Sequence, residues 1–173
     1  MKKFIGSIAI MIIFSMLLHG MANAQLNTLS TTLASENLNS EAKAKAIAKA
    51  AASKTKAERN FKKNYKTAAD VNWSSDEKSF HAYYKENEVA TRIAYDNKGR
   101  WFRTIKTYNA DKLDKAVAGT VKRQFKGYNI TSVNDVQEGS MHCYFLNIVK
   151  DKDLKQIAYY QGEITVYNQF NLQ

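Results

Sequence analysis

Ser79-Phe80-His81-Ala82-Tyr83-Tyr84 is matched position by position by Ser140-Met141-His142-Cys143-Tyr144-Phe145 later in the same chain. Both stretches are rich in aromatic residues and suit β-strands, in which successive side chains point to opposite faces. Each follows a predicted helix that ends near an aromatic residue, Tyr65 in the first case and Phe125 in the second. The chain therefore contains an internal repeat.

The similarity continues beyond these two strands. Arg92-Ile93-Ala94-Tyr95 echoes Gln156-Ile157-Ala158-Tyr159, and Gly99 and Gly162 occupy equivalent turns. Repeated units that cannot bury their apolar faces alone usually pack together. We therefore predict one two-repeat domain over residues 58–173, with repeat 1 over about 58–108 and repeat 2 over about 109–173.

A helix is predicted ahead of the strands of each repeat. Ser40 suits the N-cap of an exposed Ala/Lys-rich helix, which should dock on a core from about Glu58. Its apolar face is Phe61, Tyr65, Ala68 and Ala69. Asn109 or Asp111 is predicted to cap the second helix, with Gly127 at its C-cap. The buried stripe of that helix is Leu113, Val117, Val121 and Phe125.

Eight strands are predicted from short aromatic-rich or alternating stretches. They cover residues 71–73, 80–84, 89–95, 101–108, 129–136, 141–149, 154–160 and 163–167. The turn Asp96-Asn97-Lys98-Gly99 separates two of them. The predicted fold class is α+β, with two tandem helix-plus-four-strand repeats that form an antiparallel sheet with helices on one face.

Side-chain alternation sorts the two faces of this sheet. The more apolar set is predicted to face the helices: Phe80, Ala82, Tyr84, Met141, Cys143 and Phe145. The opposite, open face is then predicted to carry the binding residues, which are His81, Tyr83, Arg92, His142, Tyr144 and Gln156. Tyrosine is enriched at protein interfaces. The alternative, in which these aromatics are cross-strand pairs that stabilise the sheet, stays open.

The N-terminus has the three parts of a cleavable signal peptide over residues 1–24. Lys2 and Lys3 precede an apolar run to Leu18, which is shorter than a membrane span, and Ala22-Asn23-Ala24 ends the segment. We expect cleavage after Ala24, a periplasmic or secreted location and no later transmembrane segment. Residues 25–57 are predicted to be a polar leader followed by the basic helix.

The positive charge is concentrated in one segment. The whole chain carries a formal net charge of +10, and residues 41–67 contain nine Lys or Arg and two Glu. Such a segment can bind anionic lipid headgroups or lipopolysaccharide, although a solvated helix also accounts for it. The candidate basic patch is Lys43, Lys45, Lys49, Lys54, Lys56, Lys62, Lys63 and Lys66.

The order of these elements resembles the small exported PepSY-like proteins of Bacteroidetes, also described as β-lactamase-inhibitor-protein-like (BLIP-like). The resemblance rests on Phe61-x3-Tyr65, Val71-Asn72-Trp73, Phe80 with Tyr84, and Ala94-Tyr95-Asp96 with Gly99, followed by the repeat. It implies a two-repeat α+β fold with a curved antiparallel sheet and an exported location. It implies no activity and assigns no catalytic residues.

The sequence contains no motif of a catalytic or cofactor site. Cys143 is predicted to be a small buried side chain rather than a reactive thiol. His81 and His142 occupy equivalent positions, but no carboxylate or thiolate pattern supports a metal site beside them. We therefore expect a protein that is not an enzyme and has no cofactor and no metal.

These observations favour a binding module. The expected partner is a protein or peptide of the cell envelope, recognised through the open sheet face, and no nucleic acid is expected. The alternative is an electrostatic binder of anionic envelope surfaces through the basic helix 41–67. The expected oligomeric state is a monomer or weak dimer.

Overall fold

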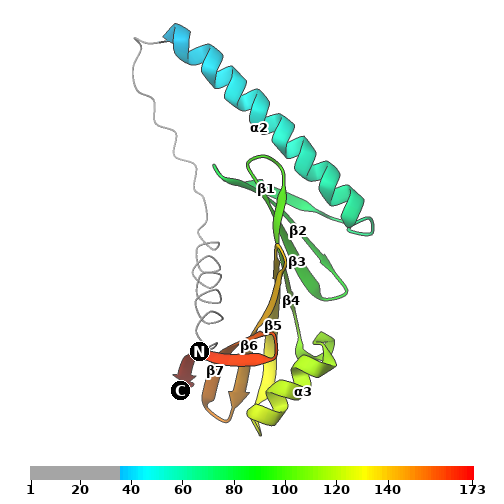
Figure 1. Cartoon of the computed structure of the whole chain (residues 1–173), viewed down its shortest axis with the longest axis vertical. Helices are drawn as coiled ribbons and strands as arrows, with labels where there is room; N and C mark the ends of the chain where they lie inside the picture. Colours follow the sequence, from blue (N-terminus) through cyan, green and yellow to red (C-terminus); the bar gives the residue numbers. More distant parts are fainter. Residues whose placement is uncertain (1–35) are drawn as a thin grey trace. The chain divides into compact units, whose positions relative to one another are not determined.

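Eight strands form a single antiparallel sheet in which neighbours in the chain are neighbours in space (Figure 1). The computed structural model describes residues 36–173. The strands are β1 (Asn72–Ser75), β2 (Ser79–Glu86), β3 (Val89–Asp96), β4 (Trp101–Tyr108), β5 (Asn129–Glu138), β6 (Met141–Lys150), β7 (Asp153–Tyr160) and β8 (Glu163–Asn171). The predicted α+β fold with an antiparallel sheet is confirmed.

The first helix of the described chain, α2 (Glu36–Asn64), begins earlier than predicted. Ser40 lies inside it and does not cap it, because the helix already begins at Glu36. The chain divides into two units between Ala48 and Lys49. The predicted signal peptide 1–24, and the leader up to residue 35, lie outside the described residues.

The helical residues of the first unit have exposed side chains from Ser40 to Ala48. Alanine and lysine favour the helix here through their backbone propensity. The Glu41 carboxylate also accepts a 2.8 Å ion pair from Lys45, one helical turn away. An exposed pair of this kind adds only a few tenths of a kcal/mol.

In the second unit, the remaining part of α2 docks on the first four strands. Ala57 and Phe61 are buried against β2 and β3, in a cluster that includes Phe80, Ala82 and Ile93. The ring of Phe61 also stacks on Tyr65 and meets Trp73 edge-on. The predicted docking of this helix from about Glu58 is confirmed at Phe61. The predicted apolar face is wrong beyond it, because α2 ends at Asn64: Tyr65, Ala68 and Ala69 lie after the helix, and Ala69 is exposed.

The second helix, α3 (Lys115–Gln124), starts after a short 3-10 turn, η2 (Ala110–Lys112). Its N-cap is Asp114, whose carboxylate accepts the backbone N–H groups of Ala116 and Val117 at 2.9 and 3.1 Å. Neither Asn109 nor Asp111 caps it, because η2 intervenes. The predicted C-cap is also wrong, because the helix ends at Gln124 and its C-cap is Phe125 rather than Gly127. Val117 and Val121 of the helix, and Leu113 just before it, are buried. They pack on the strand residues Val133, Leu146, Ile148 and Ile157.

Within the second unit, α3 and the part of α2 from Lys49 onward pack on the same face of the sheet, as predicted. Strand register shows this directly, because directly paired residues on neighbouring strands point to the same side. One row of directly paired residues crosses the sheet from the core that packs on α2 to the core that packs on α3. It consists of Tyr84, Thr91, Lys106, Asp135, Tyr144, Tyr159 and Ile164. We call the side that carries this row the helix face.

The phase of β6 differs from the prediction. Tyr144, Leu146 and Ile148 point to the helix face and contact the cluster around α3. Cys143 and Phe145 therefore lie on the opposite side, and so does Met141. The prediction placed these three residues against the helix and is wrong for β6, whereas for β2 the facing set Phe80, Ala82 and Tyr84 is confirmed.

Candidate functional site

The face opposite the helices is crossed by a second row of paired residues. This row is Tyr83, Arg92, Ile105, Val136 and Cys143. We name this side of the sheet the Tyr83 face. The row passes from an aromatic and a cationic side chain in repeat 1 to apolar side chains in repeat 2.

Tyr83 and Arg92 form the accessible end of this row. Tyr83 is 36% exposed, and the guanidinium carbon of Arg92 lies 5.9 Å from the centroid of its ring. The two residues are directly paired between β2 and β3, which holds them side by side. A cation over an aromatic ring at an exposed site contributes about 0.5–1 kcal/mol. The pair therefore presents a preorganised aromatic and cationic surface.

The repeat 2 end of the row is apolar. Val136 and Cys143 are directly paired and fully buried, and in the next row Phe145 pairs with Ala158. Burial raises the pKa of the Cys143 thiol to about 12, with the nearby carboxylates of Asp135 and Glu138 adding to the shift. Such a thiol stays protonated and is a poor nucleophile. The prediction of a buried, free Cys143 is confirmed.

His81 also lies on the Tyr83 face, but its ring is held by a local turn. Its Nε2 atom lies 2.7 Å from the Ser79 hydroxyl and 3.2 Å from the Asp76 carboxylate. The same carboxylate accepts the backbone N–H groups of Lys78 and Ser79 at 2.8 Å each. His81 is thus part of the hydrogen-bonded network that closes the turn between β1 and β2.

Gln156 belongs to a row of polar side chains on the same face. Its amide nitrogen donates to Asn147 at 3.1 Å, and its carbonyl oxygen accepts from Asn168 at 3.3 Å. Asn147 in turn donates to the Ser132 hydroxyl at 2.8 Å. The row therefore links strands β5, β6, β7 and β8 by side-chain hydrogen bonds, and its members satisfy one another.

His142 and Tyr144 do not share the Tyr83 face. Ala82, which faces α2, connects through Ile93, Thr104 and Gln137 to His142 by direct pairing. The prediction that these two residues join His81 and Tyr83 on one open face is therefore wrong. The physical reason is that both phases of β6 are apolar, and the longer apolar series Tyr144, Leu146 and Ile148 is the one that covers α3.

On the helix face, His142 instead takes part in a network with Asp135. The Asp135 carboxylate lies 2.7 Å from His142 Nε2 and accepts a 3.1 Å hydrogen bond from the Tyr108 hydroxyl. The ring of His142 also lies 4.8 Å from that of Tyr144, centroid to centroid. Burial and the adjacent Asp135 charge raise the pKa of Tyr108 well above its usual value. Tyr108 therefore acts as a hydrogen-bond donor to this carboxylate.

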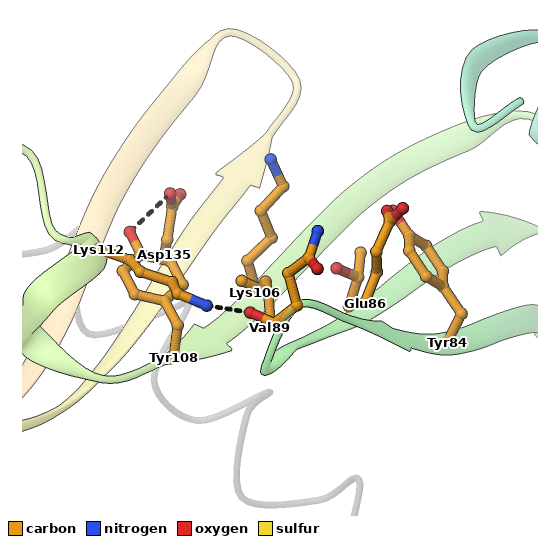
Figure 2. A pocket seen from close by; sticks show the side chains of 9 residues that line it. Tyr84, Glu86, Val89, Lys106, Tyr108, Lys112 and Asp135 are labelled. Carbon is orange, nitrogen blue, oxygen red and sulfur yellow. Dashed lines mark hydrogen bonds between the residues drawn. The ribbon is translucent and has the colours of Figure 1, made fainter. Parts of the chain in front are cut away.

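A groove of about 370 Å³ lies beside this network (Figure 2). Its lining includes Tyr84, Glu86, Lys106, Tyr108, Lys112 and Asp135. Lys112 donates a hydrogen bond to the carbonyl oxygen of Asn87, which ties the end of η2 to the β2–β3 turn. In Figure 2 the Lys106 side chain extends between Asp135 and Glu86. The groove can bind polar groups of either charge.

Sequence reasoning missed this groove. Two of its charged residues, Lys106 and Asp135, occupy helix-face positions of the two central strands, where the register pairs them directly. The available signal was that Lys106 and Asp135 are polar although they share a strand face with Tyr108 and Val133. These two residues lie two positions away along β4 and β5 and are buried. That signal becomes readable only when the pairing of β4 with β5 is known.

The predicted basic patch consists of exposed lysines on and just beyond α2. Lys45 pairs with Glu41 at 2.8 Å and Lys54 with Glu58 at 3.5 Å. Ile47 is the large apolar residue on this stretch, with 62% of its surface exposed. A single such residue gives little apolar area for insertion into a lipid surface.

Residues 36–173 contain no cluster of three or more His, Cys, Asp or Glu side chains that could hold a metal ion. No helix in this range is both long enough and apolar enough to cross a membrane.

No family model matches this chain, and no curated protein sequence matches it. Solved structures do. A DUF2874 family protein from Bacteroides ovatus is 20% identical, with a TM-score of 0.53 over 67% of this chain and 85% of that one. A proposed periplasmic protein from Bacteroides eggerthii is 24% identical, with a TM-score of 0.53 over 67% and 86% of the two chains.

A BLIP-like protein from Bacteroides fragilis is similar as well. It is 12% identical, with a TM-score of 0.54 over 68% of this chain and 84% of that one. At these identities the likeness concerns the fold. The PepSY-like part of the expected resemblance stays a prediction. The fold of this chain is that of the BLIP-like and DUF2874 structures of Bacteroides.

Proposed function

We propose that this chain is an exported, non-catalytic binding module that recognises a protein of the cell envelope through the Tyr83 face. The observation that carries the proposal is the pair Tyr83 and Arg92, which are exposed and lie side by side on adjacent strands. Ile105, next in the same row, is half-buried, whereas Val136 and Cys143 are fully buried and offer no contact surface. Tyrosine and arginine are enriched among the residues that dominate binding energies at interfaces.

The geometry of the sheet supports the same choice of face. The cores that hold the helices occupy the other face, so the Tyr83 face is the side on which a partner meets strands rather than helices. Tyr83 and Arg92 lie on adjacent strands of a hairpin, and their pairing restricts both side chains before any partner binds. A preorganised contact loses less conformational entropy on binding.

The polar side chains of this face play different parts in the proposal. His81 already makes hydrogen bonds with Ser79 and Asp76. Gln156 already makes hydrogen bonds with Asn147 and Asn168. We therefore assign them to the rim and to the support of the surface, and assign Tyr83 and Arg92 to contact. His142 and Tyr144 are on the helix face and are left out of the binding surface.

The proposed location outside the cytoplasm rests on two observations. The first is the charged, apolar and small-residue pattern of residues 1–24. The second is the similarity in fold to the B. eggerthii protein, which is described as a proposed periplasmic protein. A fold by itself does not fix a function, so the partner has to be found by experiment.

The test is a capture experiment with the full chain carrying a C-terminal tag, expressed in its own cells and recovered from envelope extracts. The variant Tyr83→Ala/Arg92→Ala is compared with Tyr144→Ala, which removes a tyrosine from the helix face. We expect a protein that is retained by the parent chain and by Tyr144→Ala and is lost from the double variant. Equal capture by all three proteins would contradict the proposal.

The salt dependence of capture separates this proposal from electrostatic binding through residues 41–67. Contacts made by exposed lysines weaken steeply as salt is added, whereas contacts with a large apolar part do not. We expect the specific partner to stay bound at moderate salt. Release of all captured material by salt, in every variant, would assign the binding to the basic segment.

A further inference from the structure

A hollow lined by aromatic and basic residues lies at the first edge of the sheet, between the end of α2 and β1. It has a volume of about 670 Å³ and is lined by Phe61, Lys62, Tyr65, Lys66 and Trp73, among others. It lies on the helix face, because Trp73 pairs with Ala82 and contacts Phe61. It is therefore separate from the Tyr83 face and from the groove at Lys106.

The floor of the hollow is rigid and apolar. The rings of Phe61 and Tyr65 stack at 5.0 Å between centroids, and Trp73 meets Phe61 at 5.6 Å. The Tyr65 hydroxyl is held 3.1 Å from the Thr104 hydroxyl, which also accepts from the Trp101 indole at 2.9 Å. These contacts fix the aromatic walls. An apolar side chain that entered the hollow would bury its surface against preformed rings.

The rim of the hollow is positive. Lys62 and Lys66 are exposed, and the one carboxylate on the lining, Glu58, already lies 3.5 Å from Lys54. Lys62 stands in the last turn of α2, where a positive charge suits the helix dipole. Lys66 lies beyond the helix end, so the dipole does not account for it. The two ammonium groups favour a ligand with carboxylates next to its apolar group.

The hollow opens beside an unpaired strand edge. Within residues 36–173, β1 pairs with β2 alone and forms the edge of the sheet. It has only four residues, Asn72–Ser75, which limits the length of strand that can add to it, and it has no charged side chain. Natural edge strands are commonly protected by charges, by bulges or by being short. An edge without charges still offers its free backbone groups to a short extended peptide, which can add as a further strand.

We propose that this edge binds an extended acidic peptide segment of a partner protein. The segment adds as a strand to β1, an apolar side chain enters the hollow on Phe61 and Trp73, and flanking carboxylates pair with Lys62 and Lys66. This site is distinct from the Tyr83 face, so either can be right without the other. Charge complementarity selects an acidic segment, and the aromatic floor selects an apolar anchor.

The test uses the full chain and a short fluorescent peptide in which glutamate and threonine alternate around one central phenylalanine. Binding is measured by fluorescence anisotropy for the parent chain, for Lys62→Glu/Lys66→Glu, and for Lys122→Glu/Lys126→Glu. The last variant makes the same charge change on and beside α3, at exposed positions away from the hollow. Two control peptides replace the phenylalanine by serine or every glutamate by lysine.

We expect the parent chain and the α3 variant to bind the acidic peptide, with binding at least about tenfold weaker for the Lys62 and Lys66 variant. We also expect both control peptides to bind at least about tenfold more weakly than the acidic one. Hydrogen exchange of the backbone amides of Asn72–Ser75 should slow when the peptide is present, because a new strand would protect the free edge. This readout reports strand addition independently of charge.

Four results would overturn the proposal. They are no binding of the acidic peptide, equal weakening by the two charge-reversed pairs, full binding of the peptide without phenylalanine, and unchanged exchange at Asn72–Ser75. Binding of anionic phospholipid vesicles that is lost with Lys62→Glu/Lys66→Glu, without peptide binding, would assign the lysines to a membrane surface instead. None of these results bears on capture through Tyr83 and Arg92.

Discussion

Gly99 lies directly against the backbone of Ser53, so the turn between β3 and β4 contacts the helix α2 without any side chain in between. A Cβ atom built on Gly99 would fall 2.3 Å from the Ser53 carbonyl oxygen and 3.0 Å from the backbone nitrogen of Ala57. Gly99 also has a φ angle of +70°, which favours glycine. This turn therefore determines how closely α2 approaches the sheet.

We predict that Gly99→Ala lowers the free energy of unfolding by about 2–5 kcal/mol, since it adds steric overlap to backbone strain. Gly162, in the equivalent turn between β7 and β8, provides a matched control. Its φ angle is +89°, but no atom lies within 4 Å of a built Cβ. Gly162→Ala should cost only about 1–2 kcal/mol from strain alone. Urea unfolding of both variants measures the difference, and equal losses would refute the close approach.

The N-terminus of α3 provides a second test. Because the Asp114 carboxylate accepts the N–H groups of Ala116 and Val117, we predict that Asp114→Ala lowers the unfolding free energy by about 1 kcal/mol. Asp111 lies in η2, so Asp111→Ala should change it by less than about 0.5 kcal/mol. Thermal or urea unfolding of the two variants distinguishes them. A larger loss for Asp111→Ala would place the cap where the sequence alone had put it.

Removal of the hydroxyl group should have opposite effects on stability for Tyr95 and Tyr65, two tyrosines of the core that packs on α2. Tyr95 is fully buried, and its hydroxyl has no hydrogen-bond partner among the described residues. Tyr95→Phe should therefore leave the unfolding free energy unchanged or raise it by about 1 kcal/mol. Tyr65→Phe should lower it by about 1 kcal/mol, because the hydrogen bond with Thr104 is lost. A clear loss of stability for Tyr95→Phe would indicate that its hydroxyl is satisfied.

Acid should weaken the turn between β1 and β2. Partial burial alone would raise the pKa of Asp76, but hydrogen bonds from Lys78, Ser79 and His81 outweigh it and lower the pKa from 3.8 to about 2. A carboxyl whose pKa is lowered by folding stabilises the native state above its unfolded pKa, near about 4, and loses that contribution as pH falls towards 2. Stability should therefore decline across this window.

The variant Asp76→Asn isolates this contribution. At neutral pH it should be less stable than the parent chain, and the difference should shrink as pH falls from about 4 to 2. Glu77→Gln changes the neighbouring exposed carboxyl and serves as the control. Urea unfolding midpoints at several pH values provide the measurement. A difference that stays constant down to pH 2 would contradict the lowered pKa of Asp76.

The sequence was sufficient for the elements and their order. All eight strands and both helices appear where aromatic alternation and helical spacing predict them, because these signals are local. The boundaries differ where local signals compete. Ser40 and Asp111 are both good capping residues, but α2 begins at Glu36 and η2 displaces the start of α3 to Lys115.

The sequence by itself determined the repeat, the α+β class and the helix-facing phase of β2, where only one phase is strongly apolar. The tertiary structure decided the phase of β6, because Cys143 and Phe145 in one phase are as apolar as Leu146 and Ile148 in the other. Only the packing of α3 selects between them. That selection moved His142 and Tyr144 to the helix face and left Tyr83 and Arg92 on the other. The groove at Lys106 and Asp135 and the hollow at Trp73 likewise depend on the pairing of strands and the docking of a helix, which no local pattern encodes.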